Sequence, residues 1–93
     1  TLECTDCLIH TVPVGKNVVI WAQVPTSEIL FILSQSSLMF EFHNGNALRK
    51  CPKCVYENSS AILRDIQLNE SGIYIIKVGF TRCICINLTV TSK

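Results

Sequence analysis

Six cysteines are the side chains of this chain best suited to chemistry: Cys4, Cys7, Cys51, Cys54, Cys83 and Cys85. The first four form two C-x-x-C pairs, C-T-D-C and C-P-K-C, and this is the spacing with which thiolates share a tetrahedral zinc ion. Six cysteines in a small domain are equally suited to a set of disulfides, whose connectivity the sequence does not choose. Zinc-stapled and disulfide-stapled modules are therefore the two alternatives.

Three Asn-x-Ser/Thr motifs, at Asn58, Asn69 and Asn87, bear on this choice because they are acceptors for N-linked glycans. Glycosylation takes place in the secretory pathway, where thiols are consumed by disulfides. We therefore expect six disulfide-bonded cysteines, no metal or other cofactor, three glycosylation sites, and a location outside the cell, either at its surface or secreted. The zinc-stapled module is the less favoured alternative, and N-glycans on the protein would exclude it.

Catalytic patterns are weak in this chain. His10 and His43 lack a Ser or Cys nucleophile pattern around them, and there is no Gly-rich phosphate loop. Redox chemistry at a C-x-x-C pair would need a βαβ context, which the sequence does not predict. The net charge is +1 with scattered Lys and Arg, unlike a nucleic-acid footprint. We expect neither an enzyme nor a binder of small-molecule substrates or nucleic acid.

The elements that must position these residues are predicted to be strands. Alternating or continuous apolar runs bounded by Gly, Pro, Asn and Ser are typical of strands, and no segment of useful length has a helical period. The expected strands cover residues 17–24, 29–35, 38–43, 61–66, 73–78 and 83–91. Asn44-Gly45 predicts a hairpin turn, residues 46–55 a loop or short edge strand, and residues 1–10 a leader.

Length limits the architecture. The 93 residues have room for one core, so we expect a single domain over residues 1–93. No apolar run approaches the roughly 20 residues of a membrane span, and no signal peptide is recognisable. The expectation is an excised mature domain whose full-length chain is anchored in a membrane.

The corner between two of the strands is diagnostic. Glu70, Ser71, Gly72 and Tyr74 have the spacing of the acid, small residue, Gly and Tyr found at the corner of immunoglobulin-type sandwiches. There the Tyr hydroxyl bonds back to the backbone just upstream. The sequence thus predicts an all-β, immunoglobulin-like antiparallel sandwich.

Residues 14–74 resemble the N-terminal V-type immunoglobulin domain of the carcinoembryonic-antigen-related adhesion family, including its pregnancy-specific glycoprotein branch. Residues 15–20 (G-K-N-V-V-I) are similar to its G-K-x-V opening of strand B, and Val24-Pro25 to its Leu-Pro turn. Residues 56–60 (Y-E-N-S-S) resemble its Y-x-N-x-S, and residues 69–74 (N-E-S-G-I-Y) its N-D-T-G-x-Y.

The resemblance implies a V-type sandwich without the central disulfide between strands B and F. The usual cysteine positions fall at Ala22 and Ile76, and Leu33 stands where the Trp of strand C is expected. Losing a disulfide over such a loop costs about 4 kcal/mol, so apolar packing must hold the sheets together. The six cysteines present are not usual in that family.

V-type geometry also suggests where those cysteines lie. The N-terminus, the C'-C'' loop and the F-G loop share one end of such a domain, so all six cysteines are expected at that end. At least one bond is expected between the N-terminal strand and strand G. At the corner, Glu70 is expected to pair with Lys50 or Lys53.

A protein-binding face is expected on the C-F-G sheet, extended by the strand that follows strand C, since the resembling family makes homophilic and heterophilic contacts with its C-F-G face. If Phe31, Leu33, Tyr74 and Ile76 point into the core, their neighbours form an exposed apolar patch with a polar rim. The expected binding residues are Leu30, Ile32, Met39, Glu41, His43 and Ile75. Asn58 and Asn69 are expected away from this face, with Asn87 on strand G as the exception.

The predicted function is that of an extracellular recognition domain of a cell-surface adhesion or immune-receptor protein. Its partner is expected to be a protein, either another receptor or a second copy in a homodimer. The alternative is a secreted or viral immunomodulator with the same fold. A transmembrane segment in the full-length chain would distinguish the two.

Overall fold

The computed structural model describes residues 4–35 and 37–92. Within these residues the chain forms strands and one short 3-10 helix, η1. In chain order they are β1 (Leu8–Pro13), β2 (Val18–Trp21), β3 (Ile29–Ser34), β4 (Ser37–His43), β5 (Asn46–Lys50), β6 (Cys54–Glu57), β7 (Ser60–Leu63), η1 (Leu68–Glu70), β8 (Gly72–Val78) and β9 (Arg82–Thr91). In the part of the chain that is described, no helix has the length and apolar character to cross a membrane.

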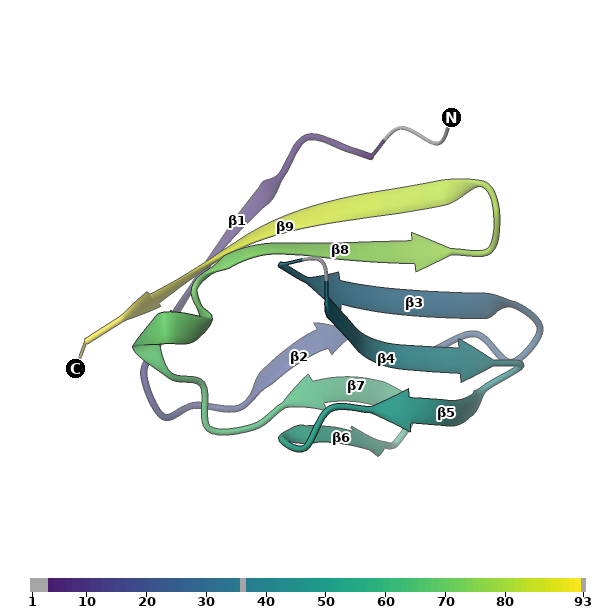
Figure 1. Ribbon diagram of the computed structural model, residues 1–93, viewed down its shortest axis with the longest axis horizontal. Helices are drawn as coiled ribbons and strands as arrows, with labels where there is room; N and C mark the ends of the chain where they lie inside the picture. Colours follow the sequence, from purple (N-terminus) through teal and green to yellow (C-terminus); the bar gives the residue numbers. More distant parts are fainter. Residues whose placement is uncertain (1–3, 36, 93) are drawn as a thin grey trace.

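The strands form two layers (Figure 1). One sheet has six strands in the order β1-β9-β8-β3-β4-β5, and the other has three in the order β2-β7-β6. The pairing is antiparallel except between β1 and β9, which run parallel. In immunoglobulin lettering, β2, β3, β4, β8 and β9 correspond to strands B, C, C', F and G. The all-β prediction is confirmed.

One segment has more regular structure than expected, and another contains the short edge strand that was one of its two predicted alternatives. The expected leader, residues 1–10, contributes the start of β1, while its first three residues lie outside the described part of the chain. The basic segment 46–55 contains the edge strand β5 and the start of β6. Between β4 and β5, Asn44 and Gly45 have φ values of 52° and 85°, as the predicted two-residue hairpin turn requires.

The core fills the space between the two sheets and is entirely apolar. Its members with 0% exposed surface come from β3, β4, β7, β8 and the β7–β8 connection: Leu30, Ile32, Phe40, Phe42, Ala61, Ile66 and Ile76. The Phe42 ring packs edge-on against Tyr56 at 4.8 Å between centroids, which joins the six-stranded sheet to β6. This packing is what holds the sheets together.

No disulfide crosses the core between β2 and β8, because all six cysteines are bonded elsewhere. Ile76 occupies the expected buried position on β8. The expected position on β2 is wrong, since Ala22 is exposed and lies beyond the strand, and Ile20 is the buried residue there. A register irregularity between Val19 and Trp21 lies next to this site.

The tyrosine corner is formed as predicted. The Tyr74 hydroxyl donates a hydrogen bond to the backbone carbonyl of Glu70 at 2.6 Å. Burial raises the pKa of Tyr74 above its ordinary value, and the nearby Glu70 charge adds to this against an opposing hydrogen bond with Ser34. The hydroxyl therefore stays protonated and keeps its role as a donor at neutral pH.

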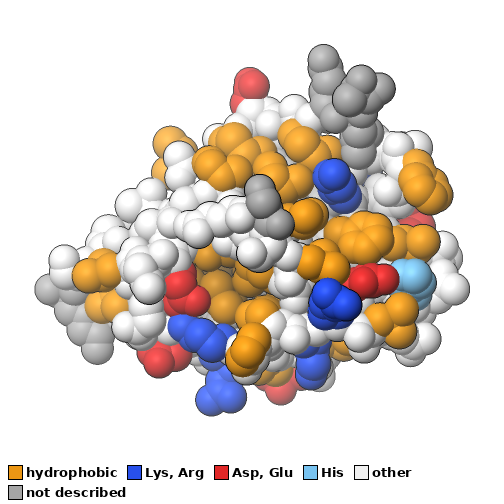
Figure 2. Space-filling view, viewed as in Figure 1, with side chains coloured by type: hydrophobic (Ala, Val, Ile, Leu, Met, Phe, Trp, Pro, Cys, Tyr) orange, Lys and Arg blue, Asp and Glu red, His pale blue; other side chains and the backbone are white. Residues whose placement is uncertain are grey.

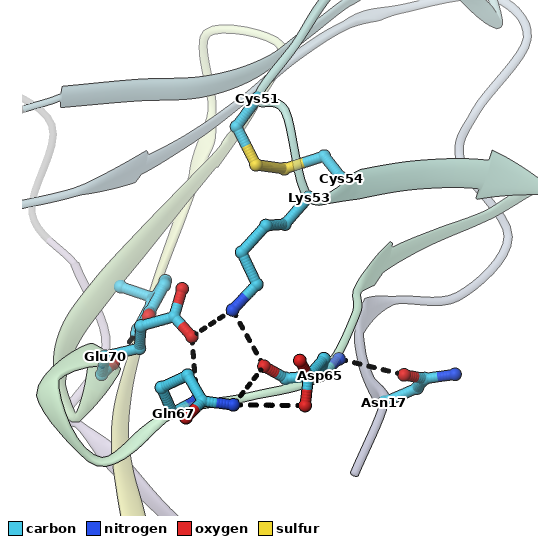
Figure 3. A network of polar contacts seen from close by, with 8 residues as sticks. Asn17, Cys51, Lys53, Cys54, Asp65, Gln67 and Glu70 are labelled. Atoms are coloured by element: carbon cyan, nitrogen blue, oxygen red, sulfur yellow. Dashed lines mark hydrogen bonds and ion pairs between the residues drawn. A yellow bond between two sulfur atoms is a disulfide. The ribbon is translucent and has the colours of Figure 1, made fainter. Parts of the chain in front are cut away.

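A polar network fixes the same corner from outside (Figure 3). Lys53 Nζ lies 2.5 Å from Glu70 Oε1 and donates to the Asp65 carbonyl at 2.7 Å. Glu70 Oε1 also accepts the Gln67 backbone N–H at 2.7 Å. Of the two lysines expected as partners for Glu70, Lys53 makes the contact.

Candidate interaction face and disulfide framework

The orientation of β3 is opposite to the one expected from the sequence. Leu30 and Ile32 are fully buried, and Ile32 is paired with Ile76 across β3 and β8. Phe31 and Leu33 are half-buried on the other side of the sheet. The prediction that Leu30 and Ile32 belong to a binding face is therefore wrong, because both belong to the core.

Met39 on β4 is also in the core, with 7% of its surface exposed, so its expected place on the binding face is wrong too. Ile32 is paired with Phe40, and the next residue, Leu33, is paired with Leu38. Met39 is the extra residue at this bulge. The bulge rotates the start of β4, so that Leu38 faces solvent where regular alternation would have placed Met39.

Glu41, His43 and Ile75 lie on the solvent side of the six-stranded sheet, as they must to take part in a binding face. Glu41 is paired with Phe31, and Ile75 with Leu33. His43 Nε2 lies 2.9 Å from Glu41 Oε2, and both side chains are partly exposed. These three residues therefore remain candidates.

We call the solvent side of β4, β3 and β8 the outer face. Its members are Ile29, Phe31, Leu33, Leu38, Glu41, His43, Ile73, Ile75 and Lys77. Two rows cross the strands: Lys77, Phe31 and Glu41 form one, and Ile75, Leu33 and Leu38 form the next. Figure 2 shows apolar side chains gathered on this side of the molecule, with basic, acidic and histidine side chains around them.

Six members of the outer face were not predicted from the sequence, namely Ile29, Phe31, Leu33, Leu38, Ile73 and Lys77. Every residue from Ile29 to Leu33 is apolar, so alternation along β3 does not indicate which set is buried. The neighbouring strand carried a usable signal. Phe40 and Phe42 alternate with Glu41 and His43, which favours burial of the two aromatic residues.

Two disulfides, Cys4–Cys83 and Cys7–Cys85, fasten the N-terminal segment to β9. The sequence predicted at least one bond of this kind. Cys83 and Cys85 pair with Lys77 and Ile75, so they lie on the same side of the sheet as the outer face. The N-terminal segment therefore lies along the β9 edge of this side and leaves β8, β3 and β4 as its central strands.

The third disulfide, Cys51–Cys54, closes the turn between β5 and β6 (Figure 3). It lies beside Lys53 and the η1 corner, whereas Cys83 lies near the far end of β8. The expectation that all six cysteines share one end is wrong. The hairpin at Asn44-Gly45 reverses the chain, and β5 carries Cys51 back toward η1 (Figure 1).

The three glycosylation motifs differ in position. Asn58 is exposed in the turn between β6 and β7, on the three-stranded sheet, and Asn69 is exposed in η1. Asn87 is half-buried on β9, where it pairs with Ile73 of the outer face. A glycan on Asn87 would therefore border the outer face, and glycans on the other two would not.

Catalytic geometry does not emerge from the histidines. His10 is exposed on β1, and His43 contacts only the carboxylate of Glu41 among the hydrogen bonds of the described residues. All six sulfur atoms are in disulfides, so no thiolate is present for a metal or for nucleophilic attack. What this arrangement offers is a partly apolar surface on a rigid sheet.

No family model matches this chain, and no curated protein does either. Solved structures do resemble it. The IG1 homodimer of ZIG-8 is 15% identical, with a TM-score of 0.72 over 99% of this chain and 85% of that one. The CD2-binding domain of CD58 is 15% identical, with a TM-score of 0.68 over 90% of this chain and 53% of that one. The extracellular domain of the voltage-gated sodium channel beta4 subunit, described as a parallel homodimer, is 13% identical, with a TM-score of 0.66 over 100% of this chain and 98% of that one.

These likenesses, at such low identity, show the fold. Strands β4 and β5 extend the β9-β8-β3 sheet, as the C' and C'' strands do in variable-type domains. The chain therefore has the two-sheet sandwich of V-type immunoglobulin domains, without the central disulfide between strands B and F.

Proposed function

We propose that this chain is the extracellular recognition domain of a cell-surface adhesion or immune-receptor protein, and that it binds a protein partner through the outer face. The observation that carries the proposal is the row of Ile75, Leu33 and Leu38 on the side of the sheet turned away from the core. An apolar centre with a polar rim is the usual anatomy of a protein interface.

The rim supports a specific contact. Lys77 lies on β8 and Glu41 on β4, with Phe31 between them on β3. Charged groups at an interface select partners and guide their encounter, while the apolar centre supplies most of the affinity. A sheet face with these groups suits another folded protein and needs no cofactor.

The proposed location rests on the cysteines and the glycosylation motifs. Three disulfides persist in an oxidising compartment, and we propose that Asn58, Asn69 and Asn87 carry glycans. Residues 1–93 then act as one recognition domain of a longer, membrane-anchored protein. The resemblance to the carcinoembryonic-antigen-related family and the likeness to CD58, whose solved domain binds CD2, support recognition of a protein.

The test uses the secreted, glycosylated domain fused to a multimerising tag and applied to a panel of cell-surface immunoglobulin proteins that includes the domain itself. Leu33→Asp places a charge at the centre of the outer face. Val19→Asp is the matched control, because Val19 is 50% exposed on the opposite sheet. We expect Leu33→Asp to abolish the binding shown by the wild type and Val19→Asp to retain it.

The opposite pattern would refute the assigned face. If Leu33→Asp bound as the wild type did while Val19→Asp lost binding, the three-stranded sheet would be the interface. Both variants must first show the unfolding midpoint of a folded domain, so that lost binding reports the surface alone.

A further inference from the structure

We infer that the outer face binds the outer face of a second copy of this chain, around a two-fold axis parallel to β3. This inference rests on the proposed function and names the partner. Its basis is the order of charges in the row of Phe31, which is basic at Lys77 on the β8 side and acidic at Glu41 on the β4 side, with Arg49 of β5 beyond Glu41.

The pairing register fixes that order. On β3, Phe31 is paired with Lys77 of β8 on one side and with Glu41 of β4 on the other. In the next row, Leu33 is paired with Ile75 on the β8 side and with Leu38 on the β4 side. Each row therefore has one member directly beneath the axis and two members on opposite sides of it.

A two-fold axis along β3 exchanges the two sides of the face. It places Lys77 of one copy opposite Glu41 of the other, and it does so twice, since a two-fold interface is isologous. The same rotation places Phe31 opposite Phe31 and Leu33 opposite Leu33. In the outer positions of the second row, Ile75 meets Leu38, so apolar contacts apolar throughout.

The spacing of a sheet suits this arrangement. Adjacent strands are about 4.8 Å apart, so Lys77 and Glu41 are displaced sideways by the same amount from the line of the axis, which runs parallel to β3 midway between the two sheets. Stacked sheets lie about 10 Å apart, a gap that an extended Lys and a Glu side chain together can bridge. Within the described residues, Glu41 uses Oε2 for His43, and its Oε1 accepts no hydrogen bond.

The edges of the face are compatible with two copies. On the β9 side the N-terminal segment is held by the two disulfides, and on the β5 side Arg49 is paired with Glu41 and exposed. Asn87 lies on β9 in the row of Ile73, which is one row beyond Ile75. A glycan on Asn87 would therefore lie at the rim of the interface and would limit its extension toward Ile73.

The experiment is sedimentation equilibrium of the secreted, glycosylated domain over a range of concentrations. The wild type is expected to show a monomer–dimer equilibrium. Lys77→Glu places a carboxylate opposite Glu41 at both contacts of the dimer, and Glu41→Lys places an ammonium group opposite Lys77 at both, so each variant should dimerise at least tenfold more weakly. Lys16→Glu, a charge reversal in the exposed turn before β2, is the matched control and should dimerise as the wild type does.

The decisive sample is an equimolar mixture of Lys77→Glu and Glu41→Lys. In the mixed dimer both contacts are attractive again, so association should return to within about threefold of the wild type, a difference of under 1 kcal/mol. The chain carrying both substitutions should also recover as a homodimer. Recovery in the mixture excludes a folding defect in the single variants, because a misfolded chain could not be rescued by its counterpart, and recovery in the doubly substituted chain shows that both substitutions are tolerated together.

Three results would overturn the inference: a wild type that stays monomeric up to its solubility limit, single reversals without effect, or a mixture no better than its components. A monomeric wild type that still binds another protein in a Leu33-dependent manner would refute the inference that the partner is a second copy, and would leave the proposed function intact. Binding that is indifferent to Leu33→Asp would instead remove the outer face itself.

Discussion

Ile32→Asp and Leu33→Asp form a matched pair that tests the orientation of β3. The two residues are adjacent and receive the same carboxylate, yet one side chain is fully buried and the other is half-buried on the outer face. Ile32 packs in the core opposite Ile76, and Leu33 lies opposite Ile75 on the outer face. The two variants should therefore differ in stability by most of the folding free energy.

The magnitude follows from the burial. Truncating a buried Ile costs about 2–5 kcal/mol, and an unpaired carboxylate in an apolar core adds several kcal/mol more. Small domains have only about 5–15 kcal/mol of stability in total, so Ile32→Asp should leave little or no folded protein. Leu33→Asp removes only the burial of a partly exposed side chain, and we expect a loss of about 1 kcal/mol or less.

The assay is urea unfolding of the purified domain, followed by circular dichroism and tryptophan fluorescence, with secretion yield as a second measure. Ile32→Asp should be secreted poorly or be unfolded without urea. Leu33→Asp should keep nearly the wild-type midpoint and slope. Equal midpoints, or a folded Ile32→Asp beside an unfolded Leu33→Asp, would show that β3 does not turn Ile32 into the core and Leu33 outward.

Two further predictions concern stability. The disulfides Cys4–Cys83 and Cys7–Cys85 close almost the same loop, with separations of 79 and 78 residues, so replacing either pair by Ser should cost only about 2 kcal/mol while replacing both should cost about 6 kcal/mol. Additive losses in urea unfolding would contradict this redundancy. Tyr74→Phe should cost about 1–2 kcal/mol by removing the hydroxyl bond to Glu70. Because folding raises the pKa of Tyr74 above 10.0, its stabilising effect is present below that pH and is lost as the pH rises through the folded-state pKa, so the wild type should lose more stability than Tyr74→Phe under alkaline conditions. Parallel pH profiles of the two proteins would contradict the role assigned to the hydroxyl.

Local sequence determined much of the architecture. The hairpin at Asn44-Gly45 follows from two residues that tolerate positive φ, and the corner before Tyr74 follows from a spacing that lets a hydroxyl reach a backbone carbonyl. The link between the N-terminal cysteines and β9 was also expected. Each of these features depends on residues close in sequence or on the order of strands typical of the fold.

The candidate face was not determined in this way. Alternation fixes that Ile32 and Leu33 lie on opposite sides of β3, but it does not fix which side is buried when both are apolar. The partner strand decides, since Ile32 aligns with Ile76, whose side of β8 faces the core. Likewise, the bulge at Met39 exists only in the pairing of β4 with β3.

The position of Cys51–Cys54 has the same origin. The C-P-K-C motif predicts that the two cysteines can bond. The end of the molecule at which this disulfide lies depends on the direction in which β5 returns from the hairpin. Sequence therefore determined most of the strands, the hairpin and corner turns, and the chemistry available to each residue, while β1 and β6 were not predicted as strands. Tertiary structure decided which apolar residues were left outside, because that choice is made by contacts between strands far apart in the chain, and the pattern along any one strand is the same for both answers.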